Sequence, residues 1–189
     1  MITLVSGLPR SGTSLMMQML YDGGMPVLAD GLREADANNP RGYLEFEKVK
    51  QLKRDDSWLP EAEGKVVKII SHLIYELPTD REYRVVFMLR PVSEVRSSQE
   101  SMLKRLGRQG APVSPAQLEK VFAQHLEEVK AWLAKHPTFS VHYILYHDIL
   151  KDPQAEAEKL NTFLGGKLDV KKMVAAVDPS LYRERKATG

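Results

Sequence analysis

The sequence predicts an α/β fold with a doubly wound parallel sheet flanked by helices. Two observations carry this prediction: four short apolar runs rich in Val and Ile, and helical patterns that lie between them. Runs that are not polar at alternate positions are typical of strands buried on both faces, as in a parallel sheet. The length of 189 residues favours one domain, covering residues 1–189.

The predicted elements alternate along the chain. The predicted strands are Ile2–Ser6, Val66–Ile70, Arg84–Leu89 and Val141–Leu145. The predicted helices run from Ser14 to about Tyr21, from Pro91 to Gly107, from Ser114 to His136, and from Asp152-Pro153 to Gly165-Gly166. Ser114-Pro115-Ala116-Gln117 reads as a capping box with proline at the first helical position. The segment of residues 29–45 is too long for a plain connection between two elements, and its length predicts a functional loop.

Composition excludes several classes of function. The 27 basic and 25 acidic residues are too balanced for a general nucleic-acid binder, so an anion site must be local. The absence of cysteine excludes disulfides, thiolate catalysis and cysteine zinc sites. The N-terminus shows no signal-peptide pattern and the chain no transmembrane run, so we expect a cytoplasmic protein without a nucleic-acid or membrane partner. The oligomeric state is left open.

Residues 7–14 read GLPRSGTS and almost form a phosphate-binding loop, GxxxxGK[ST]. The loop lies between a predicted strand and a predicted helix, where backbone N–H groups and the helix N-terminus can hold an anion. Thr13 and Ser14 add hydroxyl donors, and Arg10 adds a planar guanidinium suited to phosphate or sulfate. Thr13 stands where nucleotide hydrolases carry the lysine that reaches the β- and γ-phosphates, so we expect a donor with a shorter anionic arm.

The PRSGTS segment after a strand resembles the 5′-phosphosulfate loop of sulfotransferases that use 3′-phosphoadenosine 5′-phosphosulfate (PAPS). In carrying arginine at position 10, the segment resembles the tyrosylprotein sulfotransferases and many bacterial members. The resemblance implies a P-loop fold of the nucleoside triphosphate hydrolase type, PAPS as co-substrate, its product 3′,5′-diphosphoadenosine (PAP), and no metal. It also implies that one segment binds the cofactor: Pro9, Arg10, Ser11, Gly12, Thr13 and Ser14.

A second motif resembles the family's 3′-phosphate site, which is an arginine at a strand end and a serine eight residues later. Here Arg90 follows a predicted strand and Ser98 lies eight residues on, in the next predicted helix. Arg90 would leave the carboxyl edge of the sheet, where ligands bind in α/β folds. The family often closes this site with a basic C-terminal segment. In SLYRERK the candidates are Arg183 and Arg185, without the glycine that the family carries after its basic pair.

Two further stretches resemble sulfotransferases. Residues 146–165, YHDILKDPQAEAEKLNTFLG, resemble the pattern Y-E-D-L…D-P…L…F-L-G. His147 replaces the usual glutamate, and Ile149 the usual leucine. Residues 39–45, NPRGYLE, resemble a segment of bacterial members.

Sulfonate transfer needs a base for the acceptor and a cation for the leaving group. The cation candidates are Arg10 and Lys68. Cytosolic sulfotransferases carry Lys-Thr-His after a comparable strand, with histidine as base. His72 fits that histidine, and a neutral imidazole suits general base work near pH 7. Lys68 stands two residues before that lysine, but shares its strand face with His72 if the chain stays extended. Glu45 is the rival base, because tyrosylprotein sulfotransferases use a glutamate.

The predicted function is transfer of a sulfonate group from PAPS to a hydroxyl or amine acceptor, with release of PAP. The acceptor would be a small molecule, a saccharide or a peptide. One alternative is a P-loop kinase using ATP, in which Asp148, after the apolar run VHYILYH, would hold magnesium. The other alternative is a nucleotide-binding protein without catalysis.

Overall fold

The computed structural model describes residues 1–32, 42–108, 110 and 113–178. The strands are β1 (Ile2–Gly7), β2 (Val66–Lys68), β3 (Tyr83–Leu89) and β4 (Phe139–Leu145). The α-helices are α1 (Thr13–Asp22), α2 (Val92–Arg105), α3 (Pro115–Lys135), α4 (Tyr146–Lys151), α5 (Pro153–Phe163) and α6 (Val170–Ala175). Three 3₁₀ helices complete the described elements: η1 (Glu47–Gln51), η2 (Leu59–Ala62) and η3 (Ser71–Glu76). Within the described ranges, no helix combines the length and the apolar character needed to cross a bilayer.

The four strands form one parallel sheet in the order β2-β1-β3-β4. Gly7, the last residue of β1, pairs with Met88 near the end of β3, and Lys68 at the end of β2 pairs with Val5. The carboxyl ends of β2, β1 and β3 therefore meet at one edge of the sheet. The loop after β1 and Arg90 after β3 leave this edge as neighbours.

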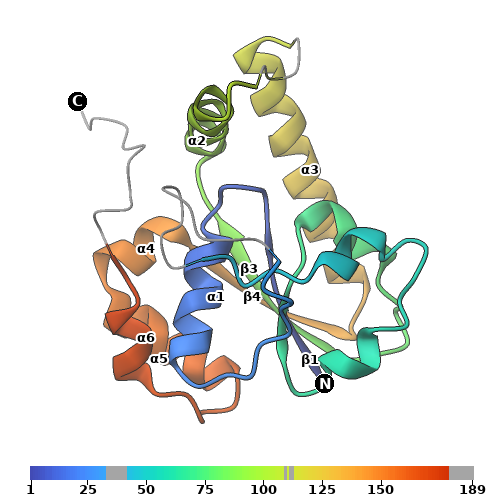
Figure 1. Ribbon diagram of the computed structural model, residues 1–189, viewed down its shortest axis with the longest axis vertical. Coiled ribbons are helices and arrows are strands. Elements are labelled where there is room, and N and C mark those ends of the chain that lie inside the picture. The colour runs from blue at the N-terminus through green and yellow to red at the C-terminus, as the bar shows by residue number, and fades with distance from the viewer. Residues whose placement is uncertain (33–41, 109, 111–112, 179–189) are drawn as a thin grey trace.

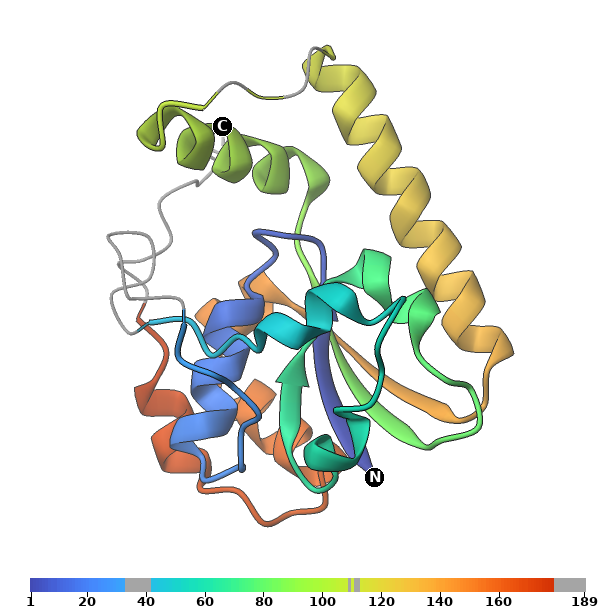
Figure 2. The same ribbon diagram turned by 45° about the vertical axis from the view of Figure 1, so that its right-hand side comes forward.

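Helices cover both faces of the sheet (Figures 1 and 2). Successive residues of the central strands point to opposite sides, so Phe87 belongs to one apolar cluster and Met88 to the other. The Phe87 cluster packs under α3 and the 3₁₀ helices, and the Met88 cluster packs against α1, α5 and α6. This arrangement confirms the predicted doubly wound α/β fold. Figure 2 shows α2 and the upper end of α3 standing beyond the carboxyl edge of the sheet.

Two local expectations are wrong. The second strand ends at Lys68 rather than at Ile70, and Ser71–Glu76 coils into η3. This coil turns Ile74 into the core, where its side chain is fully buried. Because the chain is not extended there, Lys68 and His72 do not share a strand face. Asp148 likewise lies inside α4 instead of at a strand end, because β4 stops at Leu145.

Candidate active site

The loop between β1 and α1 is shaped to receive an anion. Gly12 is the N-cap of α1, has a φ of 103°, and makes no side-chain cap. The first turn of α1 carries no acidic residue. The first N–H groups of an α-helix have no partner inside the helix, and the positive end of the helix dipole lies at the same place. The start of α1 is therefore suited to a phosphate or sulfate from outside the chain.

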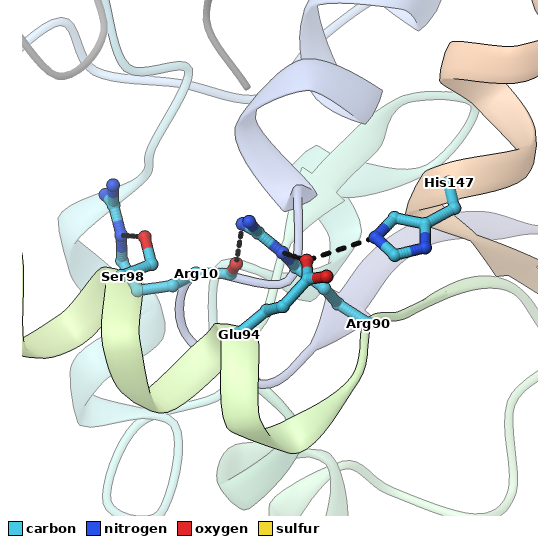
Figure 3. A network of polar contacts seen from close by, with 5 residues as sticks. All are labelled: Arg10, Arg90, Glu94, Ser98 and His147. Atoms are coloured by element: carbon cyan, nitrogen blue, oxygen red, sulfur yellow. Dashed lines mark hydrogen bonds and ion pairs between the residues drawn. The ribbon is translucent and has the colours of Figure 1, made fainter. Parts of the chain in front are cut away.

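Arg10 lies in this loop with a backbone φ of 71°, in the left-handed region that residues other than glycine rarely adopt. Two contacts hold it there (Figure 3). Its Nε donates a hydrogen bond to Ser98 Oγ at 3.1 Å, and its carbonyl oxygen accepts one from Arg90 Nη1 at 3.2 Å. The strained loop is thus joined to both residues of the β3–α2 motif. The resemblance to sulfotransferases implied that these three residues are parts of one site, and the structure brings them together.

Glu94 supplies a carboxylate that holds Arg90 in place. Sequence reasoning did not identify Glu94 as part of the site. Arg90 Nε donates to Glu94 Oε2 at 3.0 Å, and both side chains are more than nine-tenths buried. His147 Nε2 lies 3.0 Å from the same Glu94 oxygen. Glu94 therefore bridges the junction of β3 and α2 to the start of α4 (Figure 3). Arg90 lies just before the N-cap of α2 and Glu94 lies in the first turn of this helix, so the helix start brings the two side chains together.

Tyr146 is a second residue that sequence reasoning left without a role. The Arg90 guanidinium lies over its ring, with 4.8 Å between Cζ and the ring centroid. The other contact is with the loop, because a Cβ added at Gly12 would lie 2.4 Å from Tyr146 Cδ2. Burial raises the pKa of the Tyr146 hydroxyl, although the charges of Arg90 and Arg10 oppose this. The ring is therefore a neutral, buried support on which the loop and Arg90 both rest.

Lys68 brings an ammonium group to the start of α1. Its Nζ lies 3.2 Å from Ser14 Oγ and 2.7 Å from Glu45 Oε1. The Lys68 side chain is only 11% exposed. The loop lacks its lysine at position 13, yet β2 supplies one beside Ser14 from another part of the chain. Glu45 and Lys68, predicted separately as candidate base and candidate cation, form an ion pair here.

His72 has a different partner. Its exposed side chain lies in η3, and its ring stacks on that of His125 in α3, with 3.8 Å between centroids and an interplanar angle of 7°. η3 follows β2 directly, so His72 lies at the carboxyl edge of the sheet, as the loop does. His125 was not predicted as a site residue.

Some predicted residues lie outside the described part of the chain: Arg183, Arg185 and residues 39–41. Pro9 and Ser11 lie in the loop as the sequence predicted, and Thr13 is the first residue of α1, one position before the predicted start of this helix. Among the described residues, no group of three or more His, Asp or Glu side chains is placed to hold a metal ion.

Comparisons with known proteins agree with this fold. The model of the sulfotransferase domain family matches residues 2–188. The sulfotransferase STF1 from Mycobacterium tuberculosis H37Rv superposes with a TM-score of 0.60 at 19% identity, covering 93% of this chain and 70% of that one. The mouse sulfotransferase SULT7A1 complexed with PAP superposes with a TM-score of 0.58 at 17% identity, covering 99% of this chain and 66% of that one.

Retinol dehydratase in complex with androsterone and PAP gives a TM-score of 0.52 at 18% identity, covering 92% of this chain and 62% of that one. The chain thus spans just under two thirds of the length of the mouse protein and of retinol dehydratase. At these identities the structural likeness shows the fold. No curated protein sequence matches the chain significantly.

Proposed function

Because the chain belongs to the sulfotransferase domain family, we propose that it transfers a sulfonate group from PAPS to a hydroxyl or amine acceptor and releases PAP. One observation carries the proposal. Arg10 of the loop contacts both Ser98 and Arg90, so two anion-binding motifs that are far apart in the sequence form a single site. A ligand with anionic groups at two ends, such as PAPS, suits such a site better than a simple phosphate. The mouse neighbour was solved with PAP.

In this proposal the loop holds the 5′-phosphosulfate through the first N–H groups of α1 and the hydroxyls of Thr13 and Ser14. Arg90 and Ser98 receive the 3′-phosphate. The donors assembled here are guanidinium, ammonium, hydroxyl and backbone N–H groups, which is the chemistry that a phosphate- and sulfate-bearing cofactor requires. Glu94 limits the net charge around Arg90 and keeps the guanidinium in place.

The reaction moves one sulfonate group. The acceptor oxygen or nitrogen forms a bond to sulfur, the bond from sulfur to the bridging phosphate oxygen breaks, and PAP leaves with that electron pair. Arg10 belongs to the loop and Lys68 contacts Ser14 just after it, so both cations can stabilise the charge that grows on the leaving phosphate. These interactions strengthen in the transition state, so they raise the rate more than they raise affinity.

The proton of the acceptor must go to a base. Glu45 is already engaged by the Lys68 ammonium at 2.7 Å, so protonation would cost it part of that ion pair. One face of the His72 ring stacks on His125, and the His72 side chain is exposed at the edge of the sheet. We therefore assign the base to His72 and a cation-holding role to Glu45. A small-molecule acceptor is the favoured class, because retinol dehydratase was solved with androsterone.

The kinase alternative is less favoured by these observations. The loop has Thr13 in place of the lysine, and Asp148 lies within α4. Turnover of PAPS would exclude the other alternative, a nucleotide-binding protein without catalysis.

The test is a screen of PAPS consumption with phenols, alcohols, amines and saccharides, following PAP release with and without magnesium. We expect PAP release that depends on the acceptor and not on magnesium. Titrations of PAP, ADP and Mg-ATP accompany the screen, and PAP should bind more tightly than ADP without magnesium, because only PAP carries a 3′-phosphate. Equal binding of PAP and ADP, or turnover of Mg-ATP in place of PAPS, would overturn the proposal.

A further inference from the structure

Two histidines that are far apart in the sequence stack against each other beside the candidate site. His72 comes from η3, and His125 comes from the middle of α3. The ring centroids are 3.8 Å apart and the rings are inclined by only 7°, so the two imidazoles lie face to face. Both figures of the whole chain show η3 and α3 side by side, with η3 at the same edge of the sheet as the loop after β1.

The inner ring of the pair is locked in place. His125 Nε2 lies 2.8 Å from Ser71 Oγ in a buried hydrogen bond. The Ser71 side chain is fully buried and the His125 side chain is 8% exposed. Tyr75 of η3 meets the His125 ring edge-on, at 6.1 Å and 74°, and packs in turn on Trp132 of α3. The His125 ring is therefore held by contacts on its edge and on one face.

The outer ring differs from the inner one in exposure. His72 is exposed, so its imidazole can meet a ligand, while its inner face rests on His125. Burial is the main cause that lowers the pKa of His125, the proximity of His72 adds to it, and the carboxylate of Glu128 opposes it. His125 thus stays neutral near pH 7. Besides the two imidazoles, the titratable side chains that face His125 are Tyr75 of η3 and Glu128 of α3.

We propose that His125 is a positioning residue for His72: the neutral, hydrogen-bonded ring of His125 fixes the plane of the His72 imidazole in the orientation that accepts the proton of the acceptor. This inference rests on the proposed function. Without the stack, an exposed histidine on a short 3₁₀ helix would sample several rotamers, and only some of them would reach the acceptor. A misplacement of about 1 Å at a reacting group can lower a rate by about a hundredfold. A contact that fixes the orientation of the base can therefore raise the rate substantially.

The experiment separates orientation from folding. His125→Ala removes the stack and should lower kcat by about tenfold or more, while the Kd for PAP stays unchanged. The Ser71→Ala/His125→Phe double variant removes both polar partners together and keeps a flat ring under His72. Replacing both partners of a buried hydrogen bond by apolar groups is close to neutral for stability, so this variant should regain most of the wild-type kcat.

A double-mutant cycle with the base itself gives the sharpest readout. His72→Gln should lower kcat by about a hundredfold or more, as expected for loss of a general base. Adding His125→Ala to His72→Gln should cause no further loss, because His125 acts only through His72. His136→Ala is the matched control: His136 also stacks on a ring, that of Trp132 at 4.0 Å, yet it caps the far end of α3 and should leave kcat unchanged.

The outcomes distinguish this inference from the proposed function. Additive losses in the cycle, or a Ser71→Ala/His125→Phe variant that folds but is as slow as His125→Ala, would overturn the positioning role. A fully active His72→Gln variant would also overturn the positioning role of His125. The PAPS turnover of that variant would still support the proposed function. If the wild-type protein consumes no PAPS with any acceptor or with water, both fall. Should His125→Ala fail to fold, the double variant carries the test alone, and low kcat in that variant contradicts the inference.

Discussion

Substituting Gly12 by alanine tests the close contact between the loop and Tyr146. Gly12 has a φ of 103°, and an added Cβ would lie 2.4 Å from Tyr146 Cδ2, well inside van der Waals contact. Placing an L-residue in the left-handed region costs about 1–2 kcal/mol. Forcing an extra methyl group into a packed site costs about 1–3 kcal/mol more. We therefore expect Gly12→Ala to lower the free energy of unfolding by about 2–5 kcal/mol.

Gly24 supplies the matched control, because its φ is 93° but nothing lies within 4 Å of the Cβ that alanine would add. Gly24→Ala should therefore show only the backbone cost of about 1–2 kcal/mol. Alanine also restricts the unfolded chain by a similar amount at either position, so that effect cancels in the comparison. The difference between the two variants isolates the contact with Tyr146.

Urea unfolding followed by circular dichroism measures both variants, and calorimetry measures PAP binding. Gly12→Ala should also weaken PAP, because the Tyr146 ring or the loop must shift, whereas Gly24→Ala should bind PAP as the wild-type protein does. Adding Tyr146→Leu to Gly12→Ala should recover part of the lost stability. Equal destabilisation of the Gly12 and Gly24 variants, or unchanged PAP binding in both, would refute the idea that Tyr146 supports the loop.

Three further predictions concern single side chains. Arg90→Gln keeps hydrogen-bond donors but loses the charge, so it should weaken PAP by about 1.5–3 kcal/mol and 5′-AMP much less; equal losses in calorimetry would contradict a 3′-phosphate role. Arg10→Ala should lower PAPS turnover more than PAP affinity, and Thr13→Lys should lower PAPS turnover without creating ATP hydrolysis; a gain of ATP hydrolysis would favour the kinase alternative. Burial raises the pKa of Tyr83 to about 12 from 10.0. The unfolded chain therefore loses this proton at lower pH than the folded chain does, and the free energy of unfolding should fall as pH rises from 10 to 12. Tyr83→Phe should remove that fall in urea titrations and should be nearly neutral at pH 7, since within the described residues the buried Tyr83 hydroxyl has no hydrogen-bond partner.

Local signals in the sequence determined the elements. Four Val- and Ile-rich runs became the four strands, because backbone that is buried on both faces needs apolar side chains at consecutive positions. The predicted capping box at Ser114 is present, with Ser114 Oγ accepting from the Gln117 N–H and the Gln117 side chain accepting from the Ser114 N–H. The spacing of Arg90 and Ser98 marked the pair through the resemblance to sulfotransferases, but the pairing of β3 with β1 is what brings both residues beside the loop.

Only the tertiary structure decided which distant side chains meet. Lys68 reaches Ser14 and Glu45 because β2 pairs with β1 in a register that no local pattern encodes. His125 reaches Ser71 across 54 positions because α3 crosses the face of the sheet beside η3. In both cases the sequence fixes the chemistry of each residue. Its partner depends instead on strand order, register and helix packing, which arise from summed burial over the whole chain rather than from any one segment.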